Sequence, residues 1–388
     1  MIFAYPKLAP VDQEVLGMIR EQREALRFQV SNNPTRWQGF LRRNTFARAL
    51  QGSNSIEGIN ANLAEAVAIM DDEKPETLEE ETVRALSGYR TAMTYLLRVH
   101  DDPHAEVNVQ FIRSLHFMML HYDMTKMPGQ WRRGPVFVVH EPSSETVYEG
   151  PDADLVPGLM DELVAQITNA DDVESSTVLA AMAHLNLTMI RPFKDGNGRM
   201  ARALQTLVLA RNGVISPAFC SVEEWLGRNT DAYYAVLAET GQGRWNPQRD
   251  ALPWVRFCLV AHYQQAATLI KRNTQIGRVW NEIERVRREL GLPERCELVL
   301  MDATFGYKVR NQRHREQNDL SEVVASRDLR RLTDLGLLEA IGEKRGRYYV
   351  AGKPLEEIAE KCADRRRASN PYEMLTGKTK GAQLTLPV

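Results

Sequence analysis

The most informative stretch of the sequence is Arg191-Pro192-Phe193-Lys194-Asp195-Gly196-Asn197-Gly198-Arg199-Met200-Ala201-Arg202. Gly196 and Gly198 stand just before a predicted helix, so backbone amides can turn toward one point at the positive end of the helix dipole. Arg199 and Arg202 share one face of the first turn, and guanidinium groups suit phosphate oxygens. Asp195 offers a hard oxygen ligand for Mg²⁺. A helix cap with two surface arginines is the alternative, but Asp195 and the phasing of the arginines favour a polyphosphate–magnesium site.

Helical patterns surround this loop. Apolar residues at three- and four-residue spacings predict helices over about 11–30, 62–71, 81–100 and 107–121. Strongly apolar helices are predicted over 177–190 and 200–210, on either side of the loop, and another over 254–270. Residues 135–148 hold two β-rich runs around a turn, which predicts a short hairpin. The expected fold class is mainly α, a helical bundle with one hairpin.

The pattern changes after a predicted boundary near residues 285–293. Short helices are followed by two expected strands, 337–341 and 347–350, around a basic tip, which is the layout of a winged helix-turn-helix. Residues 306–347 carry ten Lys and Arg against seven Asp and Glu. Arginines 327, 330 and 331 on one helix, with Lys344, Arg345 and Arg347 on the wing, can contact DNA phosphates, but the net charge is small for DNA binding. Docking of a protein is equally compatible with this module.

The amino-acid composition limits the classes of protein to which the chain can belong. The 388 residues are 43% hydrophobic and 26% charged with a formal net charge of −2, typical of a globular protein of two or three domains. No apolar run is long enough for a membrane helix, and no signal-peptide pattern opens the sequence. The four cysteines form no C-x-x-C pair, so we expect reduced thiols, a cytoplasmic location and no zinc site.

The 191–202 stretch resembles the motif of the Fic-domain family, His-x-Phe-x-Asp/Glu-Gly-Asn-Gly-Arg-x-x-Arg, and matches every defined position except the first. The resemblance covers about residues 1–350. Residues 128–132 are similar to the family's element before a flap hairpin, and 135–148 is where that flap belongs. The segment 53–58, Ser-Asn-Ser-Ile-Glu-Gly, resembles the family's inhibitory motif. We therefore expect an N-terminal helical region (1–105), a Fic domain (106–285), a winged helix (286–352) and a C-terminal tail (353–388).

The resemblance implies a transferase that moves AMP from ATP to a hydroxyl of an unidentified protein target, with ATP and Mg²⁺ as cofactors. It assigns nucleotide binding to Lys194, Gly196, Asn197, Gly198, Arg199 and Arg202, the last on the γ-phosphate. Asp195 would hold magnesium and Phe193 would anchor the core. The branch of the family that phosphorylates its targets carries lysine at the position of Gly198, so glycine there favours adenylylation.

One position departs from the motif. The family's histidine takes the proton of the target hydroxyl, and Arg191 stands in its place here. Arginine stays protonated at neutral pH and cannot act as a general base, so we expect weak or no transfer. His184 lies two helical turns upstream, about 10 Å along the axis, and is expected to pack in the core. His140, in the expected hairpin, is expected to face solvent.

The segment 53–58 is expected to regulate nucleotide binding. By resemblance Ser53, Glu57 and Gly58 belong to an inhibitory segment in which Glu57 pairs with Arg202 and occupies the arginine that the γ-phosphate needs. A solvated surface glutamate is the alternative. A different class of function also fits the missing base: a nucleotide-sensing DNA-binding regulator or scaffold that uses the winged helix. Formation of a homo-oligomer is compatible with either.

Overall fold

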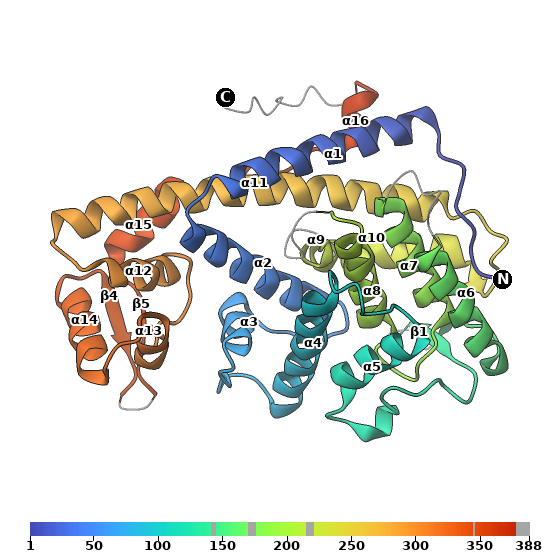
Figure 1. Cartoon of the computed structure of the whole chain (residues 1–388), viewed down its shortest axis with the longest axis horizontal. Coiled ribbons are helices and arrows are strands. Elements are labelled where there is room, and N and C mark those ends of the chain that lie inside the picture. Colours follow the sequence, from blue (N-terminus) through green and yellow to red (C-terminus); the bar gives the residue numbers. More distant parts are fainter. Residues whose placement is uncertain (141–144, 170–175, 215–220, 344–345, 378–388) are drawn as a thin grey trace. The chain divides into compact units, whose positions relative to one another are not determined.

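The computed structural model describes residues 1–140, 145–169, 176–214, 221–343 and 346–377. The chain is mainly helical (Figure 1), which confirms the predicted fold class. It divides into two compact units. The first contains residues 1–28, 42–268 and the segment from 368 onward, and the second contains residues 29–41 and 269–367.

Two helices form the centre of the first unit. Helices α7 (Ser176–Ile190) and α8 (Asn197–Arg211) pack against each other, and nearly every residue of both is buried. Their apolar residues occur on all faces, which is the pattern of a helix surrounded by protein. Helix α6 (Val156–Thr168) packs on α7, and α4 (Glu80–Val99) packs on α8. The loop 191–196 therefore joins the two most enclosed helices of the unit.

Smaller elements complete this unit. Asn62 begins α3 with a reciprocal capping box, in which its side chain accepts from Glu65 N–H while the Glu65 carboxylate accepts from Asn62 N–H. Gly52, near the end of α2, lies so close to α9 that a Cβ atom there would be 2.4 Å from the carbonyl oxygen of Glu223. The remaining elements are most of α1 (Pro10–Ser31) and α2 (Thr35–Ser55), whose residues between 29 and 41 belong to the second unit, and α3 (Leu63–Met70), α5 (Val109–Leu120), η1 (Met124–Lys126), η2 (Ala153–Leu155), α9 (Glu223–Arg228) and α10 (Thr230–Gly241).

The expected hairpin is present. Strand β1 (Phe137–His140) pairs antiparallel with β2 (Glu145–Glu149), and the tip, 141–144, lies outside the described residues. A two-residue strand, β3 (Gly243–Arg244), which the sequence did not indicate, pairs parallel with β2. Arg132 anchors the base of the hairpin, because its guanidinium donates to the carbonyls of Gly134, Pro151 and Arg191. The hairpin is thereby tied to the start of the 191–196 loop.

The second unit differs from the expected division of the chain. Helix α11 (Leu252–Glu289) continues through much of the predicted boundary and contributes its residues from 269 onward. Residues 29–41, expected in the N-terminal region, belong here: Trp37 packs on Trp280 with ring centroids 5.7 Å apart. The other elements are η4 (Glu294–Cys296), α12 (Glu297–Thr304), α13 (Asn311–Asn318), α14 (Glu322–Asp334), β4 (Leu338–Ile341), β5 (Tyr348–Ala351) and α15 (Lys353–Cys362).

The C-terminal segment is more ordered than the expected tail. Besides α15, it forms α16 (Pro371–Leu375), which belongs to the first unit. The Tyr372 hydroxyl donates to the carboxylate of Asp12 (2.8 Å), which also pairs with Arg256. Composition alone did not reveal this contact. Among the residues that the structure describes, no helix is both long and apolar enough to cross a membrane.

Candidate functional site

The loop between α7 and α8 is shaped by its own residues. Helix α7 ends where Arg191 takes a left-handed conformation (φ 48°), and Gly196 takes another (φ 73°) just before α8. Asn197 fixes the intervening loop, since its Oδ1 accepts from Phe193 N–H and its Nδ2 donates to Phe193 O, both at 2.9 Å. The Asn197 side chain therefore supports the loop rather than facing outward. No side chain caps the start of α8, which leaves its first amides available to an anion.

Phe193 anchors the loop on a histidine. Its ring is fully buried and stacks on His116 with centroids 3.6 Å apart and planes 5° apart. Gly129 N–H donates to Nδ1 of His116 (2.8 Å), so Nε2 carries the proton and donates to the carbonyl of Asp195 (3.0 Å). Burial lowers the pKa of His116 to about 4, which keeps the ring neutral. The sequence predicted a helix here but gave no signal for this role.

Arg199 and Arg202 are buried, at 2% and 1% exposed. Nε and Nη1 of Arg199, and Nη1 of Arg202, are enclosed and have no hydrogen-bond partner among the described residues. Enclosed guanidinium nitrogens without partners are costly, because their hydration is lost without replacement. Two such groups on the first two turns of α8, beside its open amides, form a site suited to an anion.

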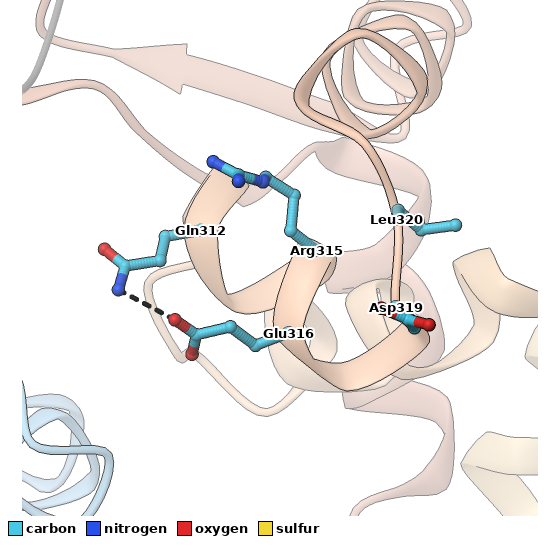
Figure 2. Close-up of a pocket in the computed structure, with 5 residues that line it drawn as sticks. All are labelled: Gln312, Arg315, Glu316, Asp319 and Leu320. Carbon is cyan, nitrogen blue, oxygen red and sulfur yellow. Dashed lines mark hydrogen bonds between the residues drawn. The ribbon is translucent and has the colours of Figure 1, made fainter.

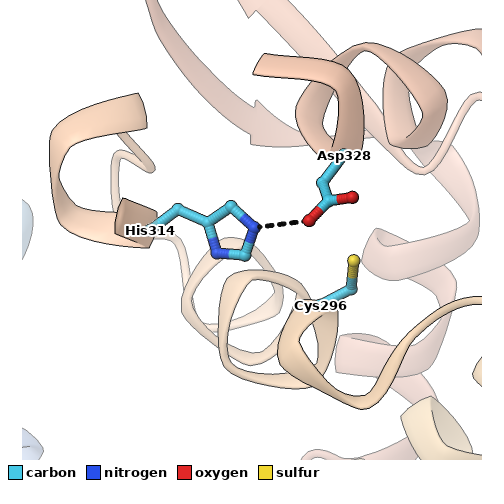
Figure 3. Close-up of side chains that lie close together, drawn as sticks. All are labelled: Cys296, His314 and Asp328. Carbon is cyan, nitrogen blue, oxygen red and sulfur yellow. Dashed lines mark hydrogen bonds and ion pairs between the residues drawn. The ribbon is translucent and has the colours of Figure 1, made fainter. Parts of the chain in front are cut away.

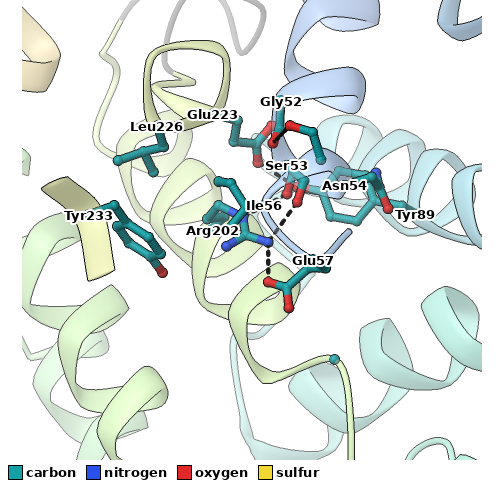
Figure 4. A network of polar contacts seen from close by, with 12 residues as sticks. Gly52, Ser53, Asn54, Ile56, Glu57, Tyr89, Arg202, Glu223, Leu226 and Tyr233 are labelled. Atoms are coloured by element: carbon teal, nitrogen blue, oxygen red, sulfur yellow. Dashed lines mark hydrogen bonds and ion pairs between the residues drawn. The ribbon is translucent and has the colours of Figure 1, made fainter. Parts of the chain in front are cut away.

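A segment distant in the sequence occupies part of this site. Arg202 Nε donates to the Ser53 hydroxyl (2.8 Å), and Nη2 donates to Ser53 O (2.8 Å) and to Oε1 of Glu57 (2.7 Å), as Figure 4 shows. Burial acts to lower the pKa of Arg202, but the Glu57 carboxylate, together with Tyr233 and Tyr89, outweighs it, so the pKa is raised. Glu57 lies in the turn after α2, which closes at Gly58 (φ 75°). The structure thus brings the residues of the 53–58 segment and the 191–202 stretch together.

A buried carboxyl lies behind Ser53 and Arg202. Glu223 accepts from the Tyr89 hydroxyl (2.5 Å) and the Ser221 hydroxyl (3.2 Å). Burial raises the pKa of Glu223 to about 6, although the Tyr89 hydrogen bond and the positive charge of Arg202 act in the opposite direction. No sequence pattern indicated this group, because it lies in a helix far from the motif.

Asp195 already has a cation beside it. Its Oδ1 accepts from Gly196 N–H (2.6 Å), and its Oδ2 lies 3.2 Å from Nζ of Lys126. Burial alone would raise the pKa of Asp195, but the charges of Arg199 and Lys126 and the Gly196 amide lower it overall. Nζ of Lys194, a predicted nucleotide ligand, donates to the carbonyl of Thr125 (2.9 Å).

Arg191 and the histidines bear on proton transfer. Burial lowers the pKa of Arg132, and repulsion by the charge of Arg191 lowers it further. Nε of Arg191 is enclosed without a partner among the described residues. His184 is fully buried between Gln205 (2.5 Å) and the Tyr233 hydroxyl (3.0 Å), and burial lowers its pKa to about 3. The expected packing role of His184 matches these contacts. The side chain of His140 lies outside the described residues.

Comparison with known proteins identifies the domain. Residues 106–209, from just before α5 to near the end of α8, match the Fic/DOC family. The chain contains a Fic domain. It is 26% identical over 266 residues to a protein adenylyltransferase Fic of Nematostella vectensis, covering 66% of this chain and 55% of that protein. It is also 26% identical to protein adenylyltransferase fic-1 of Caenorhabditis elegans, covering 68% and 47%. The chain thus spans about half the length of these relatives.

Solved structures support the fold. A Fic family protein from Desulfovibrio desulfuricans superposes with a TM-score of 0.58 at 21% identity, covering 90% of this chain and 99% of that one. Fic-1 of C. elegans superposes with a TM-score of 0.52 at 21% identity, covering 67% and 72%. The predicted Fic helical bundle is confirmed by these likenesses.

The second unit holds two further candidates. Cys296, His314 and Asp328 place their ligand atoms within 4.8 Å of one another (Figure 3). However, the Asp328 carboxylate is paired at both oxygens with Arg295 (2.5 and 2.9 Å), and burial raises the pKa of the Cys296 thiol to about 12. In the structure, the positive charge of Arg295 neutralises the carboxylate of this cluster.

A pocket of about 320 Å³ lies on α13 and the turn that follows it (Figure 2). Its charged lining is mixed, with two acidic side chains against one basic side chain, so it favours no simple ion. The lining residues are Gln312, Arg315, Glu316, Asp319 and Leu320.

Proposed function

We propose that the loop between α7 and α8 binds the phosphates of ATP, and that the Fic domain is built to transfer AMP to a hydroxyl of a protein target. The observation that carries the proposal is the pair of buried guanidinium groups on the first two turns of α8, with enclosed nitrogens that lack partners among the described residues. Two relatives bear the name protein adenylyltransferase, which supports AMP transfer as the reaction.

Different residues would contact different parts of the nucleotide. The amides of Asn197 to Arg199, at the open start of α8, and the guanidinium of Arg199 would contact phosphate oxygens, and Arg202 would take the γ-phosphate. Asp195 has the oxygen chemistry and the exposure (42% for its side chain) to hold Mg²⁺. When bound, the metal would neutralise phosphate charge. Asn197 and Phe193 would keep the loop in shape.

We further propose that transfer is impaired. A guanidinium cannot accept the proton of a target hydroxyl, and loss of a general base costs about 10²–10⁴-fold. Neither described neighbouring histidine offers a substitute, because both ring nitrogens of His116 and of His184 are engaged in hydrogen bonds. Arg191 would add positive charge near the phosphates instead, which favours binding over turnover.

Inhibition by the 53–58 segment is the third part of the proposal. Glu57 and Ser53 together use Nε and Nη2 of Arg202, so the γ-phosphate of ATP finds this guanidinium engaged. Oε1 of Glu57 also lies above Gly198, at the start of α8 where the phosphates would bind. ATP must therefore displace Glu57 or bind without its full set of contacts.

Calorimetry with ATP and Mg²⁺ tests the nucleotide site. We expect binding by the Glu57→Gly variant, a loss of about tenfold or more in affinity with Arg199→Met added, and no loss with Arg20→Met, an exposed control. Asp195→Ala should remove whatever gain in ATP affinity Mg²⁺ gives. Absence of any nucleotide binding, even with Glu57→Gly, would count decisively against the proposal.

A second candidate function is a nucleotide-sensing regulator or scaffold that binds DNA. The second unit arranges α12, α13 and α14 before an antiparallel β4–β5 pair, the order of a winged helix-turn-helix. Helix α14 exposes Arg327, Arg330 and Val323, whereas Arg331 donates to the carbonyls of Leu290 and Gly291. The basic tip residues Lys344 and Arg345 lie outside the described residues. Fluorescence anisotropy with duplex DNA over a salt series separates the two: a steep negative salt slope supports DNA recognition, and no binding removes it.

A further inference from the structure

Lys126 lies at the carboxylate that is proposed to hold magnesium. Its ammonium is 3.2 Å from Oδ2 of Asp195, 4.0 Å from Oδ2 of Asp123 and 5.5 Å from the centre of the Tyr122 ring. The side chain is 24% exposed and that of Asp195 is 42% exposed. The position next to Oδ2 is where a cation bound to Asp195 would lie, so Lys126 serves as the counter-ion of this carboxylate in the structure.

The pair is held from both sides, unlike an ordinary surface salt bridge. Asp123 accepts from the amide (3.0 Å) and hydroxyl (2.6 Å) of Thr125, which fixes the η1 turn that carries Lys126. Lys194 donates to the carbonyl of Thr125, and Gly196 N–H holds the other oxygen of Asp195. Exposed ion pairs contribute little because ordering two free side chains has an entropic cost. Here much of that ordering is already provided by the turn and the loop.

The net charge of the site without a metal equals the net charge expected of a Fic loop that holds one. A Fic loop with a neutral histidine, one aspartate and one Mg²⁺ has a net charge of +1 at these three positions. Arg191, Asp195 and Lys126 together also have a net charge of +1. The substitution at position 191 and the lysine at position 126 thus supply the positive charge that the metal would bring.

We propose that Lys126 is a built-in cation of this site, so that the loop binds a nucleoside triphosphate with or without a divalent metal. The proposal rests on the nucleotide site proposed above. A lysine ammonium is a compact charge on a flexible stem and binds phosphate well. When ATP arrives without metal, Lys126 can stay beside Asp195 and contact a phosphate oxygen. When a divalent ion arrives, it must displace Lys126, which weakens metal binding.

Calorimetry of ATP in excess EDTA and in excess Mg²⁺ tests this, in the full-length chain carrying Glu57→Gly. We expect affinities within about threefold of each other in the two buffers. Adding Lys126→Met should lower the affinity in EDTA about tenfold while leaving that in Mg²⁺ unchanged or higher. Lys126→Arg should keep binding in EDTA, and Lys74→Met, an exposed control, should change neither value. Inorganic triphosphate and AMP, run beside ATP, separate recognition of phosphates from recognition of the nucleoside.

Binding of Mn²⁺ without nucleotide, followed by electron paramagnetic resonance, is the second measurement. Lys126→Met should raise Mn²⁺ affinity, and Asp195→Ala in the same protein should abolish the gain. ATP binding that requires Mg²⁺ while Lys126 is present would overturn this inference and leave the nucleotide site intact. A Lys126→Met variant that is folded by circular dichroism and unchanged in both buffers would also overturn it. Failure of ATP to bind in either buffer would instead refute the nucleotide site itself.

Discussion

Oε1 of Glu57 lies 2.3 Å from the point that a Cβ atom would occupy on Gly198. No real Cβ atom tolerates such a neighbour, so the seated position of Glu57 depends on glycine at position 198. The same residue lies in the first turn of α8, which presents Arg199 and Arg202. The inhibitory segment and the proposed phosphate site are therefore coupled by sterics as well as by the Glu57–Arg202 ion pair.

Gly198→Ala is expected to unseat Glu57. Because the clashing atom is the end of a flexible side chain, Glu57 can move aside, and the loss in the free energy of unfolding should be about 1 kcal/mol, from the broken contact with Arg202, measured by urea denaturation. With Glu57→Gly the conflict disappears, and the alanine should then be neutral or stabilising by up to about 1 kcal/mol, as in an ordinary helix. Gly158→Ala, where a Cβ has open space, is the control and should have the same effect in both backgrounds. Equal losses from Gly198→Ala with and without Glu57 would contradict this coupling.

A graded series at Glu57 tests whether its charge inhibits ATP binding. Glu57→Gly should raise ATP affinity by about tenfold or more, since Arg202 loses a charged hydrogen bond that competes with phosphate. Glu57→Gln keeps the shape but not the charge, and should fall between the two. Equal ATP affinity in all three proteins, measured by calorimetry, would contradict inhibition of ATP binding by Glu57 and leave this residue as a structural contact.

The sequence predicted the chemistry of the loop better than its surroundings. Gly196, Asp195 and the paired arginines are adjacent in the chain, so spacing alone placed them together. His116 and Lys126 support the loop from about 70 to 80 residues away, and only the folded chain brings them to it. Periodicity predicted a helix around His116, but a stacking partner leaves no periodic signal.

The division into units was also beyond the sequence pattern. Trp37 is apolar like any core residue, and nothing in its spacing shows that it packs on Trp280, more than 240 residues later. Helix α11 runs unbroken through Leu269, where the contacts change from one unit to the other, so no turn residue marks the change. Tyr372 contacts Asp12 through a single hydroxyl, which composition cannot reveal.

Acid should destabilise the first unit through His116. The pKa of His116 is lowered from the ordinary 6.5 to about 4 in the folded chain. The neutral ring therefore makes its full contribution to the free energy of unfolding above pH 6.5, and this contribution is lost as pH falls toward 4. For this one ring we expect a loss of about 2 kcal/mol between pH 7.5 and 5. His116→Gln should remove that part of the pH dependence, whereas His104→Gln, at an exposed position, should not. Urea denaturation at both pH values measures it, and equal pH dependence in His116→Gln and the unchanged chain would contradict this assignment.

Residue 191 is expected to determine whether this domain transfers AMP. The buried arginines and the open start of α8 are suited to ATP, and the residue that should accept the proton is a guanidinium. The unchanged chain should therefore bind nucleotide yet transfer AMP barely above background. Arg191→His restores a base where the motif has one, and should raise transfer by roughly 10²-fold or more if proton abstraction is the only missing step. The measurement uses labelled ATP with four proteins: the unchanged chain, Arg191→His, Glu57→Gly and the double variant. Strong labelling only in the double variant fits a site silenced twice, once by Arg191 and once by Glu57. Robust labelling by the unchanged chain would show that another group takes the proton, and the assignment of Arg191 as the block would be wrong.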